Sequence, residues 1–128
     1  MKTLLPAGWP RPRGYAAGIS AEGRLVFVSG QIGWDRNGAF VSDSLVGQAA
    51  QALRNVVAIL AEAGAGPQHL TRLTWYVTDK REYLAQQAAL GAIYRDVIGR
   101  HYPAMSVVEV SALVEDSAKV EIEATAVV

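Results

Sequence analysis

The sequence predicts one α+β domain, residues 1–128, in which a mixed sheet is covered on one face by two helices. Short runs of β-branched and aromatic residues alternate with two longer segments of helical apolar spacing, in the order ββαβαββ. The length is sufficient for one hydrophobic core, and no linker or internal repeat divides it. The absence of cysteine excludes disulfides, a thiolate zinc site and a cysteine nucleophile.

The first half of the chain carries the elements up to the first helix. Its beginning is rich in proline and glycine, which allows only a short strand around Tyr15 to Ile19. The compact apolar run from Leu25 to Ser29 predicts a buried strand, and Asp35 to Gly38 supplies turn residues. Apolar residues then recur at helical spacing from Ser44 to Ala63, and Gly64 predicts the end of this helix.

The second half carries three strands and the other helix. Leu73 to Thr78 is rich in threonine, aromatic residues and valine, which favours a strand. A capping-box pattern beginning at Asp79 predicts a second helix that ends at Gly99. The final strands are expected at Met105 to Val110 and at Lys119 to Val127, where apolar and polar residues alternate.

The sheet is expected to have apolar side chains on both faces. Trp75 and Tyr76 are consecutive in a predicted strand and therefore point to opposite sides. Helices cover only one of these sides, so the other face predicts contact with a partner subunit.

Charge and composition exclude several function classes. The 12 basic and 12 acidic residues leave no net charge, which argues against a nucleic-acid partner and an anionic membrane surface. No apolar run is long enough for a membrane span or a signal peptide, so we expect a cytoplasmic protein. His69 and His101 are isolated from other metal-ligand residues, which argues against a metal site or a histidine-based catalytic site.

Four segments together resemble the RidA family, also called YjgF-like or endoribonuclease L-PSP-like proteins. They are Gly14 to Gly18, Val26 to Ile32, Val77 to Asp79, and Pro103 to Val110 followed by Val120 to Ala124. The resemblance implies a chorismate-mutase-like fold assembled as a homotrimer, with ligand clefts at the subunit interfaces. It also implies hydrolysis of reactive imines and enamines, as by 2-iminobutanoate/2-iminopropanoate deaminase, without a metal or an organic cofactor.

The resemblance assigns a set of cleft residues to this chain. They are Tyr15, Ser29, Gly30, Gln87, Met105, Val107 and Glu121. Glu121 is the candidate for activating water and moving its proton, although it could also be only the polar side of an alternating strand. Tyr15 could orient the substrate or simply pack. Ser29 and Gly30 could offer backbone N–H groups to an anionic group, or Gly30 could serve only the turn.

Met105 is the main departure from the family pattern. The family motif Pro-Ala-Arg-Ser reads Pro-Ala-Met-Ser here, so the arginine that holds the substrate carboxylate is missing. Losing such a contact costs on the order of 2 to 5 kcal/mol. Arg11 or Arg13 could replace the lost charge or could be solvated tail residues. Gln87 stands where the family has asparagine, and Trp34 could form a wall of the cleft.

Three functions are compatible with these residues. The leading one is a deaminase-like hydrolase that acts on a small reactive imine or enamine in an inter-subunit cleft, other than the simple α-imino acids. The first alternative is a trimer that binds a small molecule without catalysis. The second is an endoribonuclease, against which the zero net charge and the absence of paired histidines argue.

Overall fold

The computed structural model describes all residues, 1–128, and has three helices and six strands. The strands are β1 (Lys2–Leu4), β2 (Gly18–Ser20), β3 (Leu25–Gln31), β4 (Leu70–Val77), β5 (Ala104–Glu109) and β6 (Val120–Val127). The helices are α1 (Leu45–Glu62), α2 (Lys80–Ala85) and α3 (Gln87–Val97), and a single 3-10 turn spans Pro67–His69. None of the helices is long and apolar enough to cross a membrane.

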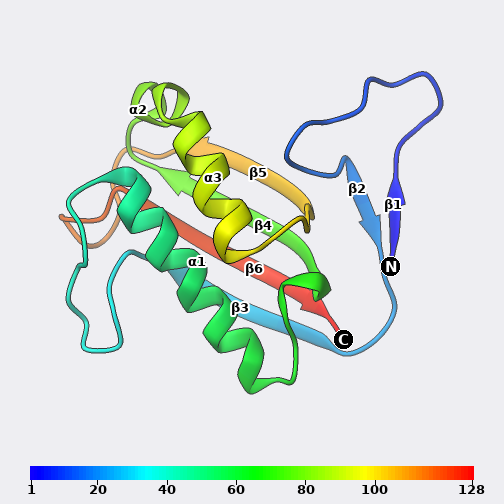
Figure 1. Ribbon diagram of the computed structural model, residues 1–128, viewed down its shortest axis with the longest axis horizontal. Helices are drawn as coiled ribbons and strands as arrows, with labels where there is room; N and C mark the ends of the chain where they lie inside the picture. The colour runs from blue at the N-terminus through cyan, green and yellow to red at the C-terminus, as the bar shows by residue number, and fades with distance from the viewer.

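Four strands form the main sheet, in the order β3-β6-β4-β5. β6 is antiparallel to both of its neighbours, whereas β4 and β5 are parallel, so the sheet is mixed. The three helices lie on one side of this sheet, and the β1-β2 ribbon extends beyond the β5 side (Figure 1). The predicted α+β class with a mixed sheet and helices on one face is therefore confirmed.

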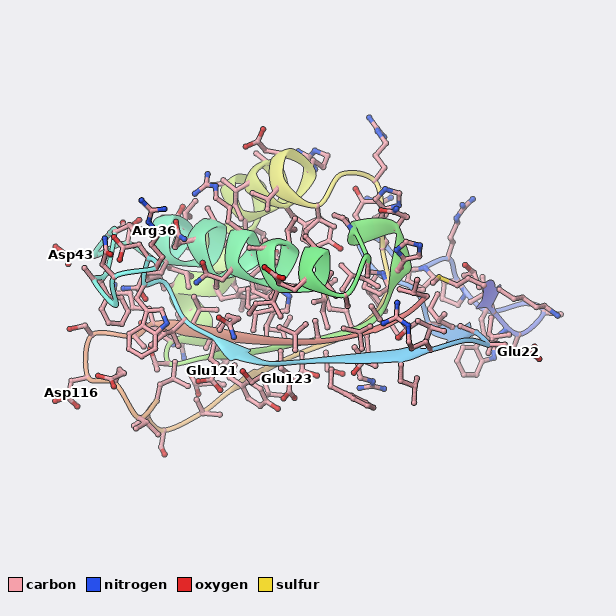
Figure 2. The ribbon with its side chains drawn as sticks, turned by 90° about the horizontal axis from the view of Figure 1, so that it is seen from below. Glu22, Arg36, Asp43, Asp116, Glu121 and Glu123 are labelled. Carbon is pink, nitrogen blue, oxygen red and sulfur yellow. The ribbon has the colours of Figure 1, made fainter.

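The core lies between the sheet and α1. Along β6 every second residue from Val120 to Ala126 is buried, which follows the period of two that a strand imposes. These side chains meet the apolar stripe of α1, where Leu53, Val56 and Leu60 are fully buried. The same alternation turns Glu121 and Glu123 to the opposite face, away from the helices (Figure 2).

The face of the sheet without helices is partly apolar, as predicted. Phe27 is 72% exposed, and Leu25 and Val108 are exposed as well. Tyr76 lies on this face opposite Glu121, while its neighbour Trp75 is buried against the helices. In the single chain nothing covers this surface.

Three elements differ from the sequence prediction. The predicted second helix is divided into α2 and α3. The division lies at Gln86, whose backbone ψ of 13° is not helical. The strand predicted at Tyr15 to Ile19 is shorter and later, and it pairs with β1, which the sequence did not predict. Ala16 instead forms an isolated bridge to Ala104, so Tyr15 is held beside β5. Along the chain, the strands of the main sheet and the helices therefore follow one another as βαβαββ, with the α2-α3 pair as the second helical unit. The β1-β2 ribbon lies outside this sheet.

Gln48 is a buried polar side chain that joins three segments. It is 1% exposed, its Nε2 donates to the carbonyl oxygens of Ser42 and Ser117, and its Oε1 accepts from the backbone N–H of Lys119. Only glycine fits beside it at position 33, because a Cβ there would lie 2.6 Å from the Cβ of Gln48. The side chain thus fixes the loop before β6, which leads into Glu121.

Gln48→Leu is expected to lower the free energy of unfolding by about 2 to 4 kcal/mol, because it leaves buried backbone groups without partners. Urea denaturation measures this effect. Gln51→Leu is the matched control, since Gln51 bonds only to Asn55 on the same helix, and it should cost less than about 1 kcal/mol. Equal losses in the two variants would contradict this role for Gln48.

Candidate functional site

A cleft of about 590 Å³ lies between α3 and β5. α3 packs mainly against α1, and β5 is an edge strand, so the space between them is left open at the side. The segment before β2 forms the remaining wall. The lining residues are Arg13, Gly14, Tyr15, Trp75, Tyr83, Gln87, Leu90, Gly91, Tyr94, Arg95, Tyr102, Met105 and Val107.

The structure brings together five of the predicted site residues in this cleft. They are Arg13, Tyr15, Gln87, Met105 and Val107. Met105 and Val107 alternate along β5 and share the face on which Leu73 and Trp75 lie in the adjacent strand. Tyr15 is 46% exposed at the edge of the cleft, and Met105 is half-buried inside it. The position of the missing arginine is therefore an apolar part of the cleft wall.

Ser29, Gly30 and Glu121 form a second group. Glu121 points away from the helices (Figure 2), Gly30 lies beside it, and Ser29 lines the same open face with Phe27 and Glu123. The register of β3 shifts between Val28 and Gln31, and this irregularity places Gly30 beside Glu121. A Cβ on Gly30 would lie only 2.6 Å from the Cδ of Glu121, so glycine is required for the carboxylate to sit there. Ser29 accepts hydrogen bonds from the side chain of Gln31 through its Oγ and its carbonyl oxygen.

Glu121 and Glu123 point to the same face of the sheet, but their surroundings differ. The hydroxyl of Tyr76 donates to Oε1 of Glu123 at 2.6 Å. This hydrogen bond to a carboxylate raises the pKa of Tyr76 above its usual value, because the phenol proton is held. The carboxylate of Glu121 has no hydrogen-bond or ion-pair partner within the chain, which leaves it available to a ligand or to water.

Trp34 and Arg11 lie outside the cleft. The ring of Trp34 packs against that of Phe40, with centroids 6.3 Å apart, and its carbonyl oxygen accepts from Nδ2 of Asn55. Arg11 lies in a neighbouring depression that also includes Arg100. Of the two tail arginines, the structure therefore places only Arg13 at the cleft.

Several cleft residues were not predicted. Gly91 and Arg95 follow Gln87 at intervals of four residues, which places all three on one face of α3. The sequence shows this shared helix face, but it does not show that a cleft lies beside it. Trp75 also lines the cleft, and its buried indole N–H has no hydrogen-bond partner.

Tyrosines surround the inner part of the cleft. The hydroxyl of Tyr94 donates to the carbonyl oxygen of His101, and its ring stacks on Tyr102 with centroids 5.6 Å apart. Burial raises the pKa values of Tyr94 and Tyr83 above their usual range. The upward shift further favours the neutral phenols, which can serve as walls or hydrogen-bond groups. No three His, Cys, Asp or Glu side chains gather as a metal site would require.

Comparison with known proteins gives consistent results. The model of the family described as endoribonuclease L-PSP matches residues 10–128. The 2-iminobutanoate/2-iminopropanoate deaminase of Salmonella typhimurium is 35% identical over 98% of this chain and 97% of its own length. The Rid-family protein YyfB of Yersinia pestis has a crystal structure with a TM-score of 0.87, at 32% identity over 99% of this chain and 98% of its own.

A third comparison concerns a structure with a bound small molecule. TdcF of E. coli, crystallised with serine, has a TM-score of 0.70 and 32% identity over 100% of this chain and 99% of its own. The fold, the sequence motifs and the matched length all agree. The chain therefore belongs to the endoribonuclease L-PSP family, which is the RidA family.

Proposed function

We propose that this protein hydrolyses a small reactive imine or enamine in a cleft shared between subunits of a homotrimer. One observation carries the proposal. The predicted site residues form two groups on opposite faces of the same sheet, Tyr15, Gln87 and Met105 on one face and Ser29, Gly30 and Glu121 on the other. A second copy that docks through its open face would bring its Glu121 to the cleft of the first.

The open sheet face supports assembly. It carries the exposed side chains of Leu25, Phe27 and Val108, which cost free energy as long as water contacts them. A cyclic trimer uses the same two surfaces on every copy, so three clefts each receive one open face. The family names found for the relatives agree with imine deamination at the level of the family.

The chemistry follows from the two groups of residues. The carboxylate of Glu121 accepts a proton from water while the water oxygen bonds to the carbon of the protonated imine, and this gives a neutral carbinolamine. Glu121 returns that proton to the nitrogen. The C–N bond then breaks, the carbinolamine hydroxyl gives its proton to the departing ammonia, and ammonium and a carbonyl compound leave. Tyr15 and Gln87 offer hydrogen-bonding groups that can orient the substrate, and the backbone N–H groups near Ser29 can meet an anionic part of it.

Ammonia release tests this function. Imines generated freshly from amino acids are mixed with the purified protein, and the rates of ammonia and carbonyl formation are compared with the uncatalysed rates. Acceleration that requires Glu121 supports the hydrolase. The alternative, a trimer that binds a small molecule without turnover, is favoured by Met105, and it predicts binding without acceleration.

Met105→Arg is expected to raise the rate on simple α-imino acids at least tenfold. A guanidinium at this position can form charge-assisted hydrogen bonds to the substrate carboxylate. Even part of the free energy of such a contact exceeds about 1.4 kcal/mol, which corresponds to a factor of ten. Steady-state kinetics with 2-iminobutanoate measure the change. Met105→Leu is the matched control and should stay within a few-fold of the wild type. An unchanged rate in folded Met105→Arg would mean that position 105 does not limit activity.

A further inference from the structure

The cleft carries positive charge even though an uncharged residue, Met105, stands at the position of the family's arginine. Arg13 and Arg95 are its only charged lining residues, and no Asp or Glu lies among the others. The single ion pair of the chain joins Lys119 and Glu82, so neither of these arginines is neutralised by a carboxylate. An unpaired guanidinium beside a hollow surface attracts anions.

Arg95 has a defined place at the cleft. It follows Gly91 by four residues on α3, and its side chain folds back over that glycine. A Cβ at position 91 would lie 3.3 Å from Nη1 of Arg95, and no atom from outside α3 would be within 4 Å of it. The absence of a side chain at 91 therefore leaves space for the guanidinium beside the cleft.

Charge and apolar surface are separated within the cleft. Arg95 is exposed and so lies at the rim, whereas Trp75 and Leu90 are buried and Met105 and Val107 are half-buried. A ligand that contacts both must carry its anionic group at one end and an apolar body at the other. Before a partner face closes its open side, the cleft of a single copy measures about 590 Å³, which lies within the range of sites for drug-sized ligands and above the needs of an imino acid of about seven heavy atoms.

We propose that Arg95 binds the anionic group of the ligand at the rim, and that the ligand is a carboxylate on an extended aryl or long alkyl body. This deepens the proposed function, because it names the class of compound that the same cleft accepts. Arg95 would take over the charge recognition that Met105 has lost, at a place farther from the buried wall. The wild-type cleft would thus discriminate against short imino acids through their length rather than their charge.

Calorimetry with three stable probes tests this proposal: 4-phenylbutanoate, its neutral isostere 4-phenylbutanamide, and butanoate. We expect 4-phenylbutanoate to bind at least tenfold more tightly than either of the others. Arg95→Gln should weaken 4-phenylbutanoate binding at least tenfold and leave the amide within twofold, and Arg95→Lys should fall between. Arg54→Gln, at an exposed position of α1 outside the cleft, should leave all three affinities unchanged.

Three outcomes would overturn the proposal: equal binding of carboxylate and amide, equal effects of Arg95→Gln on both, or no binding of 4-phenylbutanoate. These measurements involve no turnover, so their result is independent of the hydrolase. Ammonia release combined with unchanged affinities in Arg95→Gln would support the deaminase and reject Arg95. Binding that depends on Arg95 without ammonia release would support the role of Arg95 and reject the deaminase.

Discussion

Glu121→Gln is expected to lower kcat about 100-fold or more on any imine that the protein hydrolyses. A carboxylate that accepts a proton from water cannot be replaced by an amide, and general base catalysis contributes roughly 10² to 10⁴. The structure favours Glu121 for this role because its carboxylate has no partner within the chain and lies directly over Gly30. Steady-state kinetics and melting temperatures of the same preparations separate lost chemistry from lost folding.

Glu123→Gln is the matched control for this prediction. It makes the same change two residues along the same strand, on the same face of the sheet. Glu123 is already engaged by the hydroxyl of Tyr76, and glutamine can still accept that hydrogen bond through its Oε1. We expect kcat within a few-fold of the wild type. Equal, small effects of the two substitutions would reject Glu121 as the acid/base residue and favour a ligand-binding protein without catalysis.

Phe27→Asp is expected to convert the proposed trimer into monomers at micromolar concentration. Removal of a central aromatic side chain from an interface typically costs about 2 to 4 kcal/mol, and a buried, unpaired carboxylate adds to this. Because Phe27 is 72% exposed in the single chain, its substitution should leave the fold intact. Light scattering measures the mass, and circular dichroism checks the fold.

Ile59→Asp is the control for assembly. Ile59 is 38% exposed on α1, outside the cleft and on the helical side of the sheet, so it offers an apolar group on the surface that should remain free. This variant should keep the mass of the wild type. A wild-type protein that is monomeric would remove the proposed partner and with it the shared cleft. A trimer that survives Phe27→Asp would show that the open face is not the interface.

The sheet and the first helix were predictable from the sequence because their patterns are strong and local. β6 alternates apolar and polar residues along its whole length, and α1 carries an apolar stripe and a serine cap, with Ser44 accepting from the N–H of Gly47. The division between α2 and α3 was not predictable in this way. In the sequence the apolar residues Tyr83, Leu90 and Tyr94 keep a helical spacing across Gln86, so the pattern gives no sign of the interruption.

The candidate site was predictable only in part, for reasons of geometry. The family resemblance named Tyr15, Gln87, Met105 and Glu121, but a linear motif does not show that they lie on two faces of one sheet. Arg95 was missed because an exposed arginine on a helix is ordinary in a sequence. Its meaning comes from Gly91 and the cleft beside it, which only the packing of α3 reveals.

The shared site can be tested directly by mixing two inactive variants. Gly91→Phe places a phenyl ring in the cleft, and Glu121→Gln removes the proposed base from the open face; each homotrimer should be inactive. The two proteins are combined in equal amounts, unfolded and refolded together. A site formed by two copies then has an intact cleft and an intact Glu121 in about one quarter of cases, because each arrives independently with a probability of about one half.

We therefore predict that the refolded mixture hydrolyses imines at about one quarter of the wild-type rate, while each variant treated alone stays inactive. If every catalytic residue acted within one chain, no chain in the mixture would carry both an open cleft and Glu121. A mixture as inactive as its components, with mixed trimers shown by native mass spectrometry, would contradict the shared site.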